Sequence, residues 1–434
     1  MSITAIGAFG VVALLAAIFA RVPIGLALAL TGFLGYAAAD GWAHALKMLG
    51  SVPFDLASAY SLSVVPLFIL MGAVASHGRM AQELFDAANA VFSGFRGALA
   101  NATTAACAAF GGICGSSIAD AATFAKVAIP EMRRHGYEPG FAAGTVASAG
   151  TLAILIPPSV LTALYAIVAE QSLPKLYAAA FIPGFILTGL YVITVLIVAR
   201  VRPDWVPRVP SMPPRKRLRA AKGVWKLLIL FFLAVVGIYL GWFSPTEAAA
   251  VASFAAIVIA FATRTMGWGG LVEALLSSVN ATAMVFFIVI GAFVYSRFIV
   301  LTEFPTEVVN WVQARHFAPS VVVIAVMFLY VLLGTFLDEV SMILITVPVT
   351  LPLVISAGYD GIWFGIFVTV MCTIGLISPP TGMTVFVIQA QNPEIPVTKI
   401  YLGTLPFLAA DFVLVALLIA VPGVALWMPR MLGM

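Results

Sequence analysis

Charged residues are scarce in this sequence. Asp, Glu, Lys and Arg make up 9% of its 434 residues, whereas 62% are hydrophobic. A soluble protein is about 25% charged, so this chain has too few polar residues to cover a water-soluble fold. Apolar runs of roughly 17–25 residues recur from end to end and are continuous rather than alternating. We therefore expect an all-α polytopic membrane protein rather than a β-barrel.

Cysteine and histidine are also rare. The chain has three cysteines and four histidines, and the cysteines stand at no metal-binding spacing, which argues against a disulfide framework or a zinc site. No G-x-x-x-x-G-K-[ST] motif is present, and no Ser-His-Asp set lies within an apolar segment. We expect neither an enzyme nor a covalent cofactor, and any transport must be driven by an ion gradient or by a partner's ATPase.

Basic residues gather in a single polar segment. Residues 200–226 hold nine of the 22 Lys and Arg residues and one acid, Asp204. Because cytoplasmic loops of membrane proteins are rich in Lys and Arg, this segment is predicted to be a cytoplasmic linker. A nucleic-acid patch is the competing interpretation, but the segment lies between two apolar halves, so no nucleic-acid partner is expected.

The two halves are related by an internal repeat. Pro157-Pro158 and Pro379-Pro380 stand 222 positions apart, and the same offset places Gly112 on Gly334. Each half is expected to hold three scaffold spans, a re-entrant hairpin, a helix broken at the proline doublet, and a final span. The predicted ranges are 4–76, 97–130, 141–169 and 177–199 within the first half (1–199), and hairpin 319–350 and broken helix 362–390 within the second (227–434).

Five crossings in each half make the halves inverted relative to each other. With the linker in the cytoplasm, the amino terminus lies outside, and 17 Lys and Arg residues fall on the cytoplasmic side against five outside. The segments 78–97 and 302–320 are amphipathic and are expected to lie in the membrane interface.

Inverted repeats with interrupted helices are typical of secondary transporters, whose sites lie near the bilayer midplane. Proline frees backbone carbonyl groups, and these oxygens, with Ser and Thr hydroxyls, suit a sodium ion. Asp120 and Asp338 are functional candidates because carboxylates are costly at membrane depth, although either could instead cap a half-helix. Asp411 could face cargo or a neighbouring helix. Close packing of small residues is the alternative interpretation of the Gly-Ser clusters.

The motifs "GSSIADAATFAKVAIPEMRRHGYEPGFAAG", "ILIPPS", "LGTFLDEVSMILITVPVTLPL" and "GLISPPTGMTVFV" resemble the large membrane subunit of tripartite ATP-independent periplasmic (TRAP) transporters. The resemblance runs from about residue 4 to 426. The sequence departs from the family's usual Ser-Gly-Ser at Cys114-Gly115-Ser116, which leaves open whether the first residue contributes more than a backbone carbonyl.

The resemblance implies an elevator-type, sodium-driven uptake system of a bacterial inner membrane. Its cargo would be a small organic acid, such as a C4-dicarboxylate or a sialic acid, delivered by a periplasmic solute-binding protein. A separate small four-helix membrane subunit would pack on the scaffold, in contact with membrane lipid. A related sodium/carboxylate symporter that needs no binding protein is the alternative, and a channel is a further one.

Carried over onto this sequence, the resemblance implies two sodium sites. The residues assigned to ion and substrate binding are, for the first half, Ser116, Ser117, Asp120, Gly150, Thr151 and Pro157, and for the second half, Asp338, Thr373, Gly375, Pro379 and Thr381. Within these sets, sodium itself is expected at Ser116, Gly150 and Thr151, and at Asp338, Thr373 and Gly375.

Overall fold

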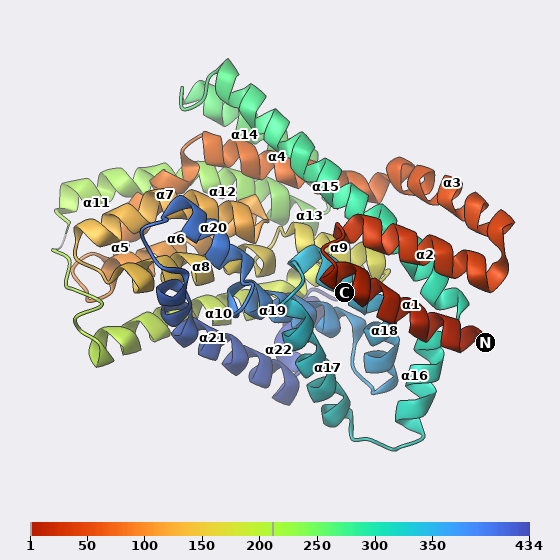
Figure 1. Ribbon diagram of the computed structural model, residues 1–434. Coiled ribbons are helices and arrows are strands. Elements are labelled where there is room, and N and C mark those ends of the chain that lie inside the picture. The colour runs from red at the N-terminus through yellow and green to blue at the C-terminus, as the bar shows by residue number, and fades with distance from the viewer. Residues whose placement is uncertain (1, 211) are drawn as a thin grey trace.

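The computed structural model describes residues 2–210 and 212–434, and this part of the chain is helical (Figure 1). The strand-like pairing within it is one isolated antiparallel bridge between Arg96 and Arg208. Ser211, within the predicted linker, lies outside the described residues.

In the described residues, ten α-helices begin before the linker. They are α1 (Ile3–Phe19), α2 (Ile24–Asp40), α3 (Trp42–Ser58), α4 (Val64–His77), α5 (Met80–Phe92), α6 (Ala98–Cys114), α7 (Ser117–Arg134), α8 (Pro139–Leu155), α9 (Val160–Val168) and α10 (Leu173–Val201). The segment of the first predicted hairpin forms α6 and α7, and the segment of the first predicted broken helix forms α8 and α9.

The remaining helices follow in a similar order. They are α11 (Pro214–Ala221), α12 (Trp225–Phe231), α13 (Gly237–Tyr239), α14 (Pro245–Ala262), α15 (Trp268–Leu301), α16 (Phe304–Gln313), α17 (Pro319–Gly334), α18 (Glu339–Ser356), α19 (Gly361–Ile377), α20 (Met383–Gln391), α21 (Val397–Ala420) and α22 (Gly423–Met431). A π-helical turn, Phe232–Val236, joins α12 to α13.

The helices are apolar and long enough for a multi-pass membrane protein. In the described ranges, seven helical stretches satisfy the length and hydropathy of a membrane span, and an eighth is added if α8 and α9, bent by 44° at their break, count as one. Five further apolar helices are 10–17 residues long, among them α6, α17 and α19.

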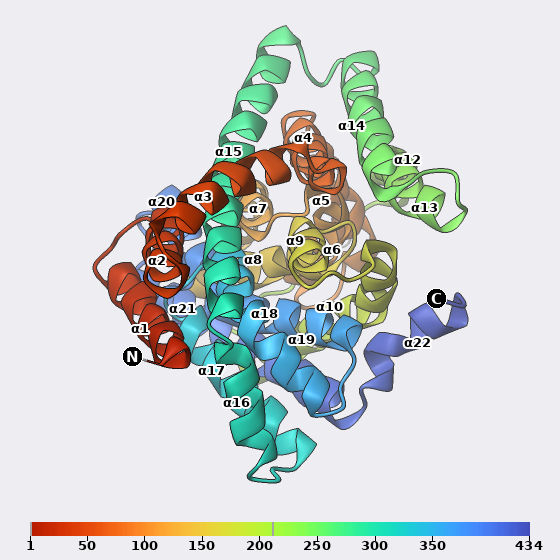
Figure 2. The ribbon, with the colours of Figure 1, turned by 90° about the vertical axis from the view of Figure 1, so that its right-hand side faces the viewer.

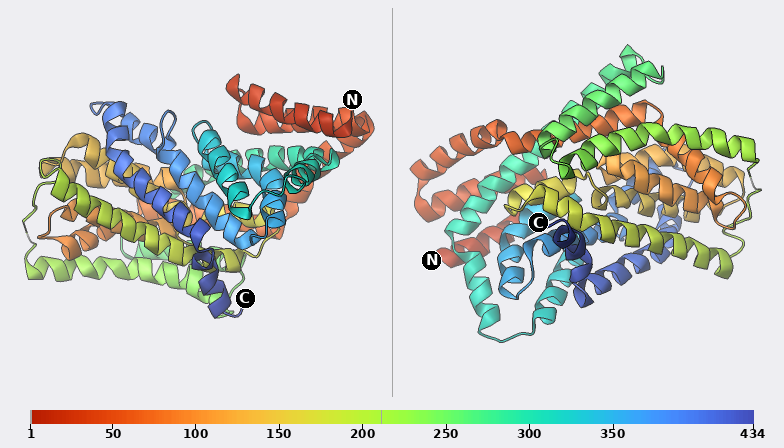
Figure 3. Two further views of the ribbon diagram at one scale, coloured as in Figure 1. Left: turned by 90° about the horizontal axis from the view of Figure 1, so that it is seen from below. Right: turned by 180° about the vertical axis from the view of Figure 1, so that it is seen from behind.

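Glycines allow the helices to pack at backbone distance. A Cβ on Gly32 of α2 would lie 2.6 Å from the backbone of Tyr295 in α15, and one on Gly144 of α8 would lie 2.4 Å from the backbone of Gly403 in α21. Figure 2 shows α14 and α15 rising away from a central group that contains α8, α9, α18 and α19, and the two views of Figure 3 show α1 and α2 lying to one side of it. The central group holds the predicted site.

Residues that cap helix starts recur at the same 222-residue offset as the proline doublets. Glu138 caps α8 by accepting a hydrogen bond from the Phe141 amide, and Asp360, 222 positions later, caps α19 by accepting one from the Ile362 amide, both at 2.6 Å. Likewise, Ser116 caps α7 and Asp338 caps α18. The local sequence therefore starts equivalent helices in both halves.

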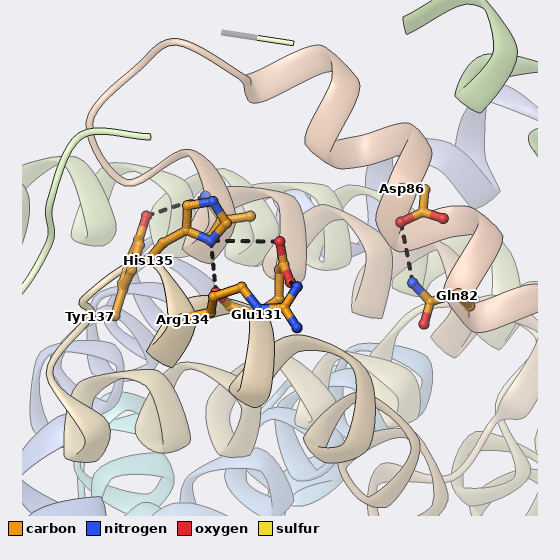
Figure 4. A network of polar contacts seen from close by, with 7 residues as sticks. Gln82, Asp86, Glu131, Arg134, His135 and Tyr137 are labelled. Carbon is orange, nitrogen blue, oxygen red and sulfur yellow. Dashed lines mark hydrogen bonds and ion pairs between the residues drawn. The ribbon is translucent and has the colours of Figure 1, made fainter. Parts of the chain in front are cut away.

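The carboxyl end of α7 carries a small polar network beside α5 (Figure 4). Glu131 accepts from Arg134 at 3.4 Å, and its backbone carbonyl lies 2.9 Å from the His135 ring. On α5, Gln82 donates to Asp86 at 3.2 Å. Burial raises the pKa of Asp86 above its ordinary value, and the hydrogen bond from Gln82 opposes that shift. These groups lie at the edge of the bundle, away from the proline breaks.

Candidate functional site

The first proline break lies directly on the tip between α6 and α7. The Val160 amide donates to the carbonyl of Gly115 at 3.4 Å. Gly115 has a φ of +62°, which favours glycine, and it turns the chain between the two helices. A Cβ on Gly112 would stand 3.0 Å from the carbonyl oxygen of Pro157, so a larger residue here would push the break away from the tip by a few tenths of an ångström.

The second break lies on the tip between α17 and α18 in the same way. The Thr381 hydroxyl donates to the carbonyl of Thr335 at this tip. Gly334 and Gly375 face each other, and a Cβ on Gly334 would lie 3.0 Å from the Cα of Gly375. Each half therefore brings one broken helix against one helix-pair tip.

Hydroxyl side chains satisfy several of the carbonyls that the breaks expose. Thr162 donates to the carbonyl of Ile154, and Thr384, 222 positions later, donates to that of Leu376 at 2.8 Å. Unpaired carbonyls are costly inside a membrane, and these bonds offset part of that cost.

Tyrosine hydroxyls on other helices also donate hydrogen bonds to backbone carbonyls at the breaks. Tyr177 donates to the carbonyl of Ser159 at 3.3 Å, and Tyr401 donates to that of Pro380 at 2.9 Å. Tyr177 lies on α10 and Tyr401 on α21, the helices that follow the two broken pairs. The backbone at both breaks is thus held by the next helix of its own half.

The residues predicted for the first ion site are divided between the tip and α8. Ser116 accepts a capping bond from Ala119, and the break at Pro157 lies on the same tip. Gly150 packs against Ala121 of α7 earlier along α8, and the Thr151 hydroxyl donates to the carbonyl of Ser148 in its own helix at 2.7 Å. The structure brings Pro157 to the tip and Gly150 to α7.

The residues predicted for the second site are divided between the α17–α18 tip and α19. Asp338 accepts from the backbone amide of Ser341 at 3.2 Å and from its hydroxyl, so it is the N-cap of α18. Gly375 lies against Gly334 beside this tip, and Pro379 is in the adjoining break. The Thr373 hydroxyl donates to the carbonyl of Val370 at 2.7 Å.

Asp120 is fully buried on α7. Neither of its carboxyl oxygens has a hydrogen-bond partner among the described side chains and backbone, and the thiol of Cys107 is the group that faces it. No Lys or Arg forms an ion pair with it in the ranges that the structure covers. A carboxyl group in this setting needs a cation or a proton.

Glu339, next to Asp338, is a buried carboxyl at the second tip that the sequence interpretation did not assign to the site. Its side chain is buried, one carboxyl oxygen accepts from the Ser117 hydroxyl at 2.8 Å, and the other has no partner within the described chain. Ser117 and Glu339 are separated by 222 positions, the repeat offset itself. These two residues occupy equivalent positions in the repeat, and their hydrogen bond connects the α6–α7 tip directly to the α17–α18 tip.

Asp411 forms a second buried cluster between the halves. It accepts from the Tyr191 hydroxyl of α10 at 2.8 Å and from Thr373 of α19 at 3.5 Å. Its second carboxyl oxygen is buried and unpartnered in the part of the chain described. Asp411 therefore contacts the neighbouring helices α10 and α19.

This arrangement is found in solved membrane transporters. The fold matches the YdaH transporter of Alcanivorax borkumensis with a TM-score of 0.61 and 16% identity, covering 89% of each chain. It matches MtrF of Neisseria gonorrhoeae, titled an antimetabolite efflux pump, with a TM-score of 0.58 and 12% identity over 89% of this chain and 85% of that one. The protein is therefore a polytopic helical membrane protein that shares its fold with these two proteins.

Sequence comparison narrows the class to a family. Residues 11–424 match the model of the tripartite ATP-independent periplasmic transporter, DctM component. The chain is 36% identical over 383 residues to the C4-dicarboxylate TRAP transporter large permease protein DctM of Pseudomonas aeruginosa, covering 88% of this chain and 89% of that protein. It is 28% identical to the sialic acid large permease SiaM of Vibrio cholerae, covering 95% of this chain and 96% of that one.

The chain belongs to the DctM family of TRAP transporter large permeases, which confirms the resemblance seen in its motifs. Members are transporter permease subunits and not enzymes, as the sequence predicted.

Proposed function

We propose that this protein is the sodium-coupled permease that moves a small organic acid across a bacterial inner membrane. Relatives are named for C4-dicarboxylates, sialic acid and 2,3-diketo-L-gulonate, which are all carboxylic acids. The observation that carries the proposal is the pair of broken helices, each lying on a helix-pair tip. It supplies carbonyl and hydroxyl oxygens at two matched places in an otherwise apolar bundle.

Sodium is the coupling ion of this proposal because the donor set consists of hard oxygen atoms. The first ion would be held by oxygens of Ser116, Gly150 and Thr151, and the second by those of Asp338, Thr373 and Gly375. The buried carboxyls of Asp120 and Glu339 add negative charge beside these places and have no basic partner in the described ranges. Bound sodium ions would compensate that charge.

The organic acid would bind beside the same tips. The amino-terminal ends of α7 and α18 begin at the two tips, and helix ends of this kind favour anions. Ser117, Pro157, Pro379 and Thr381 lie at these breaks and tips, in reach of a small molecule held between them.

The halves are proposed to be inverted repeats that work as an elevator. Support comes from equivalent caps, equivalent breaks and the Ser117–Glu339 contact, all at the 222-residue offset. The proposed topology, with five crossings in each half, puts the linker in the cytoplasm, and the 17-to-five distribution of Lys and Arg supports it.

Two partners complete the proposal: a periplasmic binding protein and a small membrane subunit. The Haemophilus influenzae sialic acid TRAP permease SiaT is matched over 95% of this chain but only 67% of its own length. The relative named DctMQ, from Oleidesulfovibrio alaskensis, is matched over 63% of its length. The extra length of these relatives supports a small membrane subunit as a partner of this chain.

Reconstitution tests the binding-protein requirement. Proteoliposomes with this chain and its small subunit are assayed for uptake of a labelled C4-dicarboxylate or sialic acid, with and without the cognate binding protein. Uptake only with the binding protein supports the proposal. Equal sodium-dependent uptake without it supports the alternative, a sodium/carboxylate symporter that works alone.

A further inference from the structure

A cavity of about 350 Å³ lies where the α5–α6 turn, the end of α10 and the linker meet. Three arginines line it, Arg96 from the turn, Arg200 from the last turn of α10 and Arg208 from the linker, together with Phe95 and Leu196. No acidic residue lines this cavity. It is separate from the proline breaks and tips described above.

The backbone holds two of these arginines side by side. Arg96 and Arg208 form the isolated antiparallel bridge, so the turn and the linker are paired at this point. Gly97, with a φ of +77°, packs against Val195 of α10, where a Cβ would lie 2.7 Å from the valine side chain. The three chain segments are therefore fixed relative to one another.

A second contact fastens the linker to the same turn. Arg217 donates to the Ser93 hydroxyl at 2.9 Å and to the Ser93 carbonyl at 3.3 Å. The linker is also joined to the start of α8, where the Glu138 amide donates to the Trp205 carbonyl at 3.1 Å. The arginine cluster is thus part of an ordered corner and not of a loose tail.

The positive charge of this corner is not balanced by protein acids. None of the ion pairs in the described ranges includes Arg96, Arg200 or Arg208. Asp204, the one acid of the linker, is exposed and makes no such pair in that part of the chain. Three guanidinium groups around one cavity attract an anion that can accept several hydrogen bonds, and phosphate is the common one.

An apolar stripe leads from the membrane to the cavity. Ile193, Leu196 and Ile197 of α10 are 52%, 42% and 55% exposed, and with Arg200 they follow the i, i+3, i+4, i+7 spacing of one helix face. Phe95, 65% exposed, stands beside them at the cavity. A ligand with a phosphate and a long apolar tail fits this surface, whereas free phosphate would leave the stripe unused.

We propose that this corner binds the headgroup phosphate of an anionic glycerophospholipid. The guanidinium groups of Arg96, Arg200 and Arg208 contact the phosphate oxygens, and an acyl chain lies along the α10 stripe. Basic pockets of this kind between membrane helices on the cytoplasmic side recognise anionic lipids. The repeat-related positions carry Ala318, Pro422 and Arg430, so the site exists in one half of the protein only.

Lipid titration of the delipidated full-length chain in detergent tests this site. Phosphatidylglycerol, phosphatidylcholine and inorganic phosphate are added separately, and lipid adducts are counted by native mass spectrometry while thermal unfolding is followed. Phosphatidylglycerol should form a saturable adduct and raise the Tm, with phosphatidylcholine and inorganic phosphate weaker. Equal effects of the two lipids, or an equal effect of inorganic phosphate, would overturn the proposal.

Substitutions then locate the site. Arg96→Gln and Arg208→Gln should each weaken phosphatidylglycerol binding by about fivefold, the factor expected for one basic residue at an anionic lipid surface. Arg430→Gln, the repeat-related arginine of the other half, is the matched control and should change nothing. If a glutamine variant fails to fold, Arg208→Lys keeps the charge but removes the paired donors and should still weaken binding. Unchanged binding in the folded variants would contradict the site.

Discussion

At the scale of single residues, Asp338 holds two roles that compete in principle. It caps α18 through Ser341, and it stands beside the second break where a sodium ion is proposed. Asparagine caps a helix about as well as aspartate but lacks the charge. The two roles can therefore be separated by one substitution.

Asp338→Asn should keep the fold and weaken sodium use. The half-saturating sodium concentration for uptake should rise about tenfold or more, because a contact with a charged group is worth ~1.5–3 kcal/mol. Asp360→Asn, which alters the equivalent kind of cap on α19, is the control and should leave sodium dependence unchanged. Identical sodium curves for the two variants would assign Asp338 to capping alone.

The Ser117–Glu339 contact should couple the two tips energetically. Ser117→Ala leaves a buried carboxyl without its donor, which costs about 1–3 kcal/mol of unfolding free energy. A double-mutant cycle with Glu339→Gln, measured by denaturant titration in mixed micelles, should give a coupling energy of about 0.5 kcal/mol or more. The exposed Ser58, which bonds within its own helix, supplies a control partner whose effects should add. Additivity of Ser117 and Glu339 would show that the contact contributes nothing.

Tyr191→Phe tests the Asp411 cluster. The ring is kept, but Asp411 loses its 2.8 Å hydrogen bond, so unfolding free energy should fall by about 1–3 kcal/mol. Tyr295 is equally buried and its hydroxyl makes no hydrogen bond in the described ranges, so Tyr295→Phe is the matched control with little change expected. Equal losses of unfolding free energy in both variants would mean that the Tyr191–Asp411 hydrogen bond does not stabilise the protein.

The helix breaks of the candidate site are predictable because glycine, proline and serine mark backbone breaks in the sequence itself. Glu339 was underrated because its repeat partner is Ser117, so the offset does not pair two acids. The contact between Ser117 and Glu339 is seen only in the structure, where the two tips touch. Local spacing in a sequence does not reveal contacts between distant segments. Thr151 and Thr373 bond within their own helices, a choice of rotamer that a sequence does not reveal.

At the scale of elements, the packing of α6 on α8 depends on glycine. A Cβ on Gly111 would stand 2.5 Å from the Cα of Ala153, a backbone atom that cannot yield as a flexible side chain does. This contact sets the first tip against the first break. Small residues at such crossings are the general means of close helix packing in membranes.

Gly111→Ala should therefore separate the two helices and destabilise the protein. We expect a loss of about 1–3 kcal/mol from overpacking, read from thermal unfolding in detergent. Gly189→Ala on α10, where a Cβ meets nothing within 4 Å, should be neutral or stabilising by about 0.5–1 kcal/mol. If both variants unfold alike, the close crossing of α6 and α8 is not as described.

Helix α3 shows where sequence reasoning about elements was incomplete. The sequence interpretation placed three scaffold spans within residues 4–76 and did not identify a separate helix at Trp42–Ser58, which contains Lys47, Asp55 and an internal Pro53. The structure forms a helix there with one buried face that includes Ala45 and Met48. Packing against neighbouring helices overrides the weak local signal. The proline doublets, in contrast, interrupt helices wherever they occur, which made both breaks easy to place.

At the scale of the whole molecule, the account makes a statement about sidedness. Segment 200–226 should lie in the cytoplasm, and both termini outside. Asp204 is exposed, and the three native cysteines are buried, so Asp204→Cys offers a single accessible thiol in the linker. It should resist an impermeant thiol reagent added to intact spheroplasts and react after the membrane is opened. A cysteine at exposed Lys47 should show the opposite result, and labelling of the linker from outside would reverse the topology.

Sodium coupling is the central claim, and uptake into proteoliposomes with the partner proteins present tests it most directly. Initial uptake of the organic acid is measured against external sodium concentration at fixed pH and fixed substrate-loaded binding protein. Two sodium sites predict a sigmoidal dependence, with uptake rising more than linearly at low sodium and vanishing in sodium-free buffer. Equal uptake in sodium-free buffer, driven by a proton gradient alone, would contradict the account.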